Sequence, residues 1–230
     1  MTRILLFGAT GDTGRKVLDQ ALDRGLHVRA AERDFPADFR SHEQLEKRNC
    51  NLLTGGLDEL MDDVECVVSA VGLPRDPQTL LRPPPLYTEG AVNLIEGMRK
   101  ARVKRLVVIS AAFADPDATV PTWFRAATSP LDRIFRQMGE MERILRVSQD
   151  IDWTAVRPGW LLNRPHTGEF SVSTEDMPAG TLRTRRADLA HFMLDCALED
   201  RHVRETPFIT RKENASLETP PALLEEFWPF

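Results

Sequence analysis

Three glycines near the start of the chain have the spacing that binds a phosphate group. The stretch LLFGATGDTG places Gly8, Gly11 and Gly14 directly after a short apolar run. Backbone N–H groups at a helix N-terminus stabilise an anion, and glycine lets the backbone approach it because glycine has no side chain. The order of strand, glycine turn and helix predicts a site for the pyrophosphate of a dinucleotide. The alternative is an ordinary turn in which the glycines have no ligand-binding role. The residues expected to contact it are Gly8, Thr10, Gly11, Asp12, Thr13 and Gly14.

Two charged residues, Glu32 and Arg33, stand where the second strand is expected to end. An acid there accepts hydrogen bonds from the ribose hydroxyls of NAD, whereas an arginine there pairs with the 2′-phosphate of NADP. Glu32 would repel that phosphate unless it turned away and paired with a neighbouring arginine such as Arg29. We therefore expect NADP, bound by Arg33, with NAD as the alternative. If NAD is bound, Arg33 is expected to stack on the adenine.

The elements that must position these residues alternate between strands and helices. Apolar, β-branched runs predict strands over residues 3–7, 28–31, 49–53, 64–71, 105–110, 153–157, 169–173 and 207–210. Helical spacing of apolar residues predicts helices over residues 12–24, 57–61, 87–101, 131–148 and 186–198, with loops over 73–85 and 113–130. This alternation predicts an α/β fold: a single Rossmann-type, doubly wound parallel sheet with helices on both faces and a small C-terminal extension. Ligands of such sheets bind at the carboxyl ends of the strands.

Composition and charge exclude several classes of protein. The 230 residues are 42% hydrophobic and 28% charged, with a net charge of −5, which is typical of a soluble globular domain. The basic cluster Arg183, Arg185 and Arg186 is short, so we expect a solvated helix entrance there and no nucleic-acid surface. The three cysteines lie far apart, which argues against a disulfide framework or a metal site and fits a cytoplasmic protein. No apolar run approaches the roughly 18 residues of a membrane span.

Motifs over residues 3–200 resemble those of the short-chain dehydrogenase/reductase superfamily, and most closely its NmrA-like branch and its biliverdin-reductase/flavin-reductase group. The matching stretches are GATGDTG, Ala70-Val71-Gly72, the helix at 89–95, the strand at 105–110, the runs 142–148 and 153–159, and Arg186-Ala187-Asp188-Leu189-Ala190. The resemblance implies one NAD(P)-binding domain over residues 1–230, with a cofactor-binding core over 1–160 and a C-terminal part over 161–230 that contributes to the substrate pocket. It also implies cofactor contacts from Ala70, Val71, Gly72, Ser110 and Pro158.

The resemblance breaks down at the acid–base residues. Reductases of this superfamily ordinarily use a Tyr-x-x-x-Lys pair, with a serine after the fifth strand that holds the substrate oxygen. Ser110 is present and is the candidate catalytic residue, but Ile134 and Met138 occupy the positions of the pair, and the only tyrosine is Tyr87. Members of the biliverdin-reductase/flavin-reductase group also lack the pair, because flavin-, quinone- or tetrapyrrole-like acceptors take hydride at a conjugated centre without a strong protein acid. We therefore expect an NAD(P)H-dependent reductase.

Two other functions stay open from the sequence. The first is a non-catalytic NAD(P)-binding redox sensor of NmrA type, which the missing pair favours. The second is a sugar-nucleotide-type epimerase or dehydratase, which would need the missing tyrosine. In each case we expect a small-molecule ligand, a monomer or homodimer, and neither nucleic acid nor a membrane as a partner.

Loops build the substrate pocket, so the sequence restricts its residues less than it restricts the cofactor site. The candidates are Tyr87, Trp123, Phe124, Trp160 and His166. Trp123 and Phe124 could cover a flat aromatic substrate or fill the core, and His166 is a candidate proton donor. Trp160 stands where the biliverdin-reductase/flavin-reductase group has a histidine, which argues against a tetrapyrrole. Arg157 is expected to form a structural ion pair.

Overall fold

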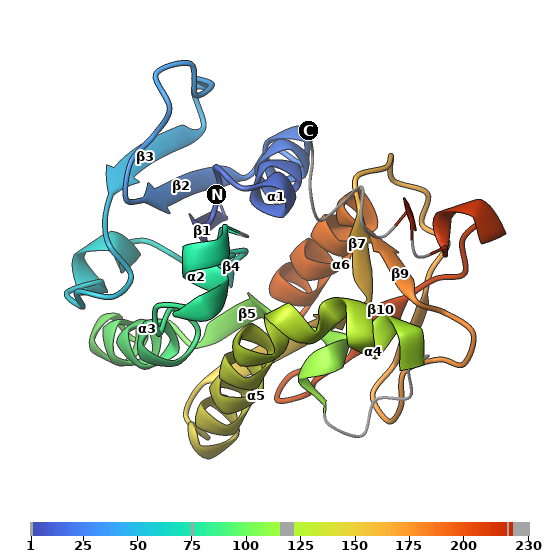
Figure 1. Cartoon of the computed structure of the whole chain (residues 1–230). Coiled ribbons are helices and arrows are strands. Elements are labelled where there is room, and N and C mark those ends of the chain that lie inside the picture. The colour runs from blue at the N-terminus through green and yellow to red at the C-terminus, as the bar shows by residue number, and fades with distance from the viewer. Residues whose placement is uncertain (1, 75, 116–121, 220, 223–230) are drawn as a thin grey trace.

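The fold is built around one mostly parallel sheet (Figure 1). The computed structural model describes residues 2–74, 76–115, 122–219 and 221–222. Its eight-stranded sheet has the order β3-β2-β1-β4-β5-β6-β10-β8, and the β10–β8 pair alone among the strand pairs of these described residues is antiparallel. The strands are β1 (Arg3–Phe7), β2 (His27–Glu32), β3 (Leu45–Asn49), β4 (Cys66–Ser69), β5 (Arg105–Ile109), β6 (Asp152–Pro158), β8 (Ser171–Ser173) and β10 (Phe208–Thr210). A further parallel pair joins β7 (Trp160–Leu162) to β9 (Arg183–Arg185).

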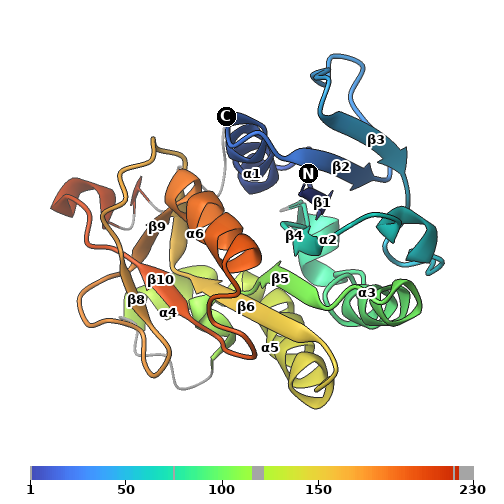
Figure 2. The ribbon, with the colours of Figure 1, turned by 180° about the vertical axis from the view of Figure 1, so that it is seen from behind.

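Helices cover both faces of the sheet, which confirms the doubly wound fold (Figure 2). On one face α1 (Asp12–Asp23) packs beside α6 (Arg186–Leu198), and on the other α3 (Thr88–Ala101) packs beside α5 (Asp132–Val147). Successive residues of β1 serve the two faces in turn, since Ile4 and Leu6 join the core under α1 and α6 while Leu5 and Phe7 join the core under α3 and α5. Burial on both faces explains why this strand is apolar throughout.

The strand order reverses at β1, which lies between β2 and β4. The connections from β1 through α1 to β2 and from β3 to β4 run to opposite sides of β1, so a crevice opens at the carboxyl end of this strand. Helix α1 begins in that crevice, directly after the glycine turn. The fold thus places the glycine turn at the point where open α/β sheets bind ligands.

Five elements differ from the sequence prediction. The third strand is Leu45–Asn49 and not residues 49–53, because its residues LEKRN lie at an edge of the sheet where three of them are exposed and hydropathy does not mark the strand. Strands β7 and β9 were not predicted, since each has only three residues. The predicted loops contain short helices, α2 (Pro77–Leu81) and α4 (Thr122–Thr128). No helix in the described ranges is long and apolar enough to cross a membrane.

Candidate functional site

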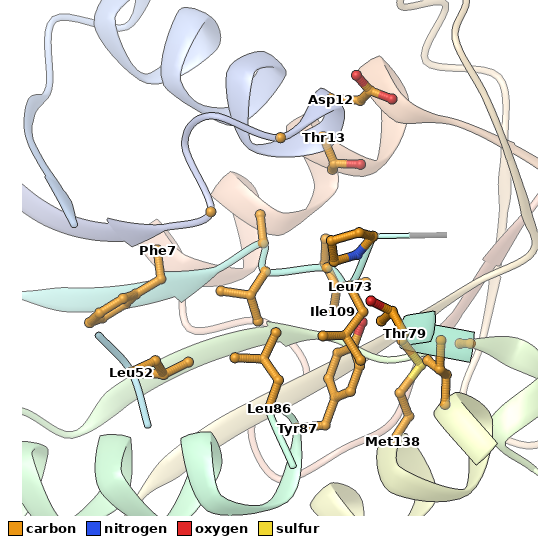
Figure 3. Close-up of a pocket in the computed structure, with 18 of the residues that line it drawn as sticks. Phe7, Asp12, Thr13, Leu52, Leu73, Thr79, Leu86, Tyr87, Ile109 and Met138 are labelled. Atoms are coloured by element: carbon orange, nitrogen blue, oxygen red, sulfur yellow. The ribbon is translucent and has the colours of Figure 1, made fainter. Parts of the chain in front are cut away.

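A cavity of about 950 Å³ lies at the carboxyl ends of the central strands (Figure 3). This volume is at the upper end of the range for small-molecule sites. The predicted site residues that line it are Gly8, Thr10, Gly11, Asp12, Thr13, Arg33, Ala70, Val71, Gly72, Tyr87, Ser110, Pro158 and Trp160. They come from the ends of five different strands and from the loops that follow, so the fold brings together residues that are far apart in the sequence.

The three glycines of the turn serve different needs. Gly8 has a φ of +85°, and a Cβ built there would lie 2.6 Å from the carbonyl of Ala70. A Cβ on Gly14 would lie 1.8 Å from the carbonyl oxygen of Gly8, so this glycine allows the turn to close on itself. Gly11 has an ordinary extended backbone, and its Cβ would meet only the Gly8 oxygen, at 3.4 Å. Gly11 lines the cavity and is the N-cap residue of α1, where no side chain caps the helix. Its missing side chain leaves space for a ligand at the helix N-terminus.

Glu32 is turned toward the glycine turn. Its Oε1 accepts a hydrogen bond from the backbone N–H of Thr10, at 2.9 Å. Burial raises the pKa of the Glu32 carboxyl, although this hydrogen bond acts in the opposite direction. The pairing with Arg29 that the sequence left open is not formed, because Arg29 donates to Glu46 Oε2 at 2.7 Å. Arg33 is exposed and lines the cavity beside Glu32.

A buried charge network supports the far side of the site. Ser110, after β5, is 1% exposed and its hydroxyl donates to Glu142 Oε1 at 2.7 Å. Arg157 of β6 donates to both oxygens of the same carboxylate, at 2.9 and 2.6 Å, and to Asp115 Oδ2 at 2.7 Å. Burial opposes the charge of Arg157, but its bonds to Glu142 and Asp115 outweigh burial and raise its pKa. The expected ion pair of Arg157 is confirmed, and the network ties β5, β6 and α5 together behind Ser110.

The sequence analysis missed the role of Glu142. The available signal is its place on the apolar face of α5, where Ile134, Met138, Met141 and Leu145 are its buried neighbours. A carboxylate on a buried helix face requires partners. The sequence does not identify those partners, because Ser110 and Arg157 come from other elements of the sheet.

Apolar side chains line the other half of the cavity. These are Leu73, Leu86, Tyr87, Phe113, Leu131, Ile134, Phe135, Met138 and Trp160. Figure 3 shows Tyr87, Leu86 and Met138 pointing into the cavity opposite the turn that carries Asp12 and Thr13. Among the described lining residues there is no lysine, and the charged ones are Asp12, Glu32, Arg33, Asp76 and Arg186. This half of the cavity therefore suits a largely apolar ligand.

Three candidates for the substrate pocket lie outside the lining of this cavity. Phe124 is 1% exposed and packs edge-on against Trp160, with ring centroids 5.7 Å apart, and Trp123 packs edge-on against Phe124. They support the wall formed by Trp160 and do not cover the opening. His166 lies beside Asp188, with Nδ1 and Oδ1 2.7 Å apart, in the loop near the start of α6. This geometry gives His166 no contact with the cavity as it stands.

A glycine turn between a strand and a helix, placed where a doubly wound sheet reverses and open to a large cavity, defines an NAD(P)-binding protein of Rossmann type. A model of the family described as NAD(P)H-binding matches residues 8–200. The chain belongs to this NAD(P)H-binding family.

The chain is also similar to individual proteins and solved structures. An uncharacterized chloroplastic protein of Arabidopsis thaliana is 29% identical over 185 residues, which cover 76% of this chain and 64% of that protein, so the match spans less than two thirds of this relative's length. Two solved structures share the fold at 19% identity. The oxidoreductase ylbE of Lactococcus lactis has a TM-score of 0.77, with 97% of each chain covered. A candidate NADH-flavin reductase of Streptococcus pneumoniae has a TM-score of 0.72, with 92% of this chain and 100% of that chain covered.

Proposed function

We propose that the chain is an NAD(P)H-dependent reductase that transfers a hydride to a conjugated acceptor of flavin, quinone or tetrapyrrole type. The observation that carries this proposal is one continuous cavity with the glycine turn at one end and an apolar compartment at the other. The bound cofactor would supply the hydride. The residues present fit a dinucleotide, because the backbone at Gly11 is open to an anion and the turn is already formed.

The residues of the chain would mainly bind and orient the two reactants. The turn around Gly11 would hold the pyrophosphate, while Val71, Ser110 and Pro158 would contact the reacting end of the cofactor. The walls formed by Tyr87 and its apolar neighbours would place the acceptor next to it and exclude water, and proximity of this kind lowers the barrier substantially. The Ser110 hydroxyl donates its hydrogen to Glu142, so we assign the proton of the reduced acceptor to solvent.

The residues that line the cavity fit a redox sensor better than they fit an epimerase or dehydratase. A redox sensor without turnover would also need no lysine in the cavity, so it stays the second candidate. An epimerase or dehydratase would need an acid–base pair on α5, where Ile134 and Met138 line the cavity instead. The similarity to a candidate NADH-flavin reductase favours the reductase.

The test is oxidation of NADPH and NADH by the purified protein with FMN, a soluble quinone and biliverdin as separate acceptors. We expect turnover that requires both the acceptor and the protein, and that is lost in Gly11→Val, the matched variant for cofactor binding. Clear cofactor binding without turnover on any of these acceptors would contradict the reductase and favour the redox sensor.

We further propose that the preferred cofactor is NADP, with Arg33 bound to its 2′-phosphate. Arg33 is exposed at the rim of the cavity, and the bond from Thr10 holds Glu32 against the turn. A hydrogen-bonded charge pair of this kind contributes about 1.5–3 kcal/mol. Arg33→Ala is therefore expected to weaken NADPH binding by at least about tenfold, with a much smaller effect on NADH.

Titrations of NADPH and NADH fluorescence against wild type and Arg33→Ala check this preference. Glu32→Gln is the companion variant, since it keeps an acceptor for Thr10 and removes the charge. It should strengthen NADPH binding and leave NADH binding unchanged or weaker. An equal loss of both cofactors in Arg33→Ala would show that Arg33 contacts a group common to both, such as the adenine.

A further inference from the structure

Arg186 is a buried arginine whose charge is poorly compensated. It is the first residue of α6, lines the cavity and is 8% exposed. Within the described residues its guanidinium makes no hydrogen bond, and its one ion pair is with Asp12 Oδ2 at 3.6 Å. The Asp12 side chain is 72% exposed, so solvent screens this pair.

Two other buried arginines, Arg105 and Arg157, are bonded far more fully. Arg105, 5% exposed, donates to the carbonyl oxygens of Cys196, Asp152 and Arg201. Arg157, 6% exposed, donates to two carboxylates. A buried guanidinium with so few partners is costly for the fold, because its lost hydration is only partly replaced. An anionic ligand in the cavity could supply the hydrogen-bond partners that the Arg186 guanidinium lacks.

The position of Arg186 limits which anion this is. Its contact with Asp12 places it at the glycine-turn end of the cavity, and Figure 3 shows Asp12 and Thr13 at the opposite end from Tyr87 and Met138. Asp12 is the first residue of α1, so an anion at the N-terminus of α1 lies next to the Arg186 guanidinium. The fork of N–H donors in arginine matches phosphate oxygens.

We propose that Arg186 is a pyrophosphate-binding residue, which exchanges its contact with Asp12 for the phosphates of the dinucleotide. Helices α1 and α6 would then hold the pyrophosphate from both sides. This inference rests on the NAD(P)H-binding part of the proposed function and not on turnover.

Arg186→Met tests the proposal by two measurements, ligand binding and thermal stability, for which we expect different outcomes. We expect binding of NADP⁺ and of ADP-ribose, which carries the pyrophosphate without the nicotinamide, to weaken by at least about tenfold. Binding of 2′-AMP, which lacks the pyrophosphate, should not change. The melting temperature of the ligand-free protein should stay the same or rise, because methionine replaces an uncompensated buried charge.

Arg15→Met is the matched control, because Arg15 is an exposed arginine of α1 that donates to the Thr10 carbonyl. It removes the same charge near the same turn and should change ADP-ribose binding much less. Asp12→Asn should strengthen ADP-ribose binding severalfold, since it removes the group that competes for Arg186 and repels the phosphates.

Several results would overturn the proposal. A lower melting temperature in Arg186→Met with unchanged ADP-ribose binding would make Arg186 a structural residue. An equal loss of 2′-AMP and ADP-ribose binding would indicate general damage to the site, and unchanged cofactor binding with a raised KM for the acceptor would assign Arg186 to the substrate. If the wild-type protein binds ADP-ribose but reduces no acceptor, only the reductase proposal is contradicted, and the role of Arg186 is unaffected.

Discussion

Gly11→Val is expected to abolish dinucleotide binding and leave the chain folded. The Gly11 backbone is in a region that any residue adopts, and a Cβ there would make an ordinary contact at 3.4 Å. The valine methyl groups would, however, occupy the space through which the backbone of the turn meets the phosphates. We expect at least about a hundredfold loss of NADP⁺ affinity and a loss of about 1 kcal/mol in the free energy of unfolding, since valine is a poor residue at a helix N-cap.

Isothermal titration with NADP⁺ and ADP-ribose measures the first effect, and urea unfolding measures the second. Gly14→Ala is the informative control, because its Cβ would lie 1.8 Å from the Gly8 carbonyl oxygen and the turn would have to shift. It should lower the free energy of unfolding by about 2–3 kcal/mol, as overpacked sites do. Normal binding of both ligands by Gly11→Val would show that the pyrophosphate does not lie on this turn.

The elements that the sequence predicts most closely are those whose burial restricts residue type. Strand β1 and helix α6 have the bounds expected for them, Arg3–Phe7 and Arg186–Leu198. Both lie in the interior of the fold, where β1 is buried on both faces and α6 along most of its surface, so most of their residues must be apolar. Edge strand β3 obeys no such requirement, because most of its side chains face solvent.

The same distinction holds for the site. The glycine turn can be predicted from the sequence because its backbone geometry excludes side chains at Gly8 and Gly14. The contacts Ser110–Glu142 and Asp12–Arg186 cannot be predicted from the sequence, since each joins residues that only the tertiary packing brings together. For this reason Arg186 was expected to be solvated and is instead buried in the cavity wall.

Removal of the Glu142 carboxylate is expected to cause the largest loss of stability among the variants considered. Glu142→Leu would leave the buried guanidinium of Arg157 without its bidentate partner, and the Ser110 hydroxyl without its acceptor. Breaking a buried ion pair from one side costs about 3–5 kcal/mol, because the remaining buried charge loses its main partner. Among the described residues, Arg157 would then keep only its bond to Asp115. Urea unfolding of Glu142→Leu against wild type measures this loss.

The double variant Glu142→Leu/Arg157→Met separates the effect of charge from that of packing. Two apolar side chains of similar size leave no buried charge on either side, so the double variant should regain much of the stability that Glu142→Leu loses. Asp150→Asn, which breaks the exposed pair with Arg99, should change the unfolding curve very little. If the double variant is as unstable as Glu142→Leu, the network stabilises the fold by the packing of its side chains and by the bond from Arg157 to Asp115. In that case the position of Ser110 does not depend on the charge of Glu142.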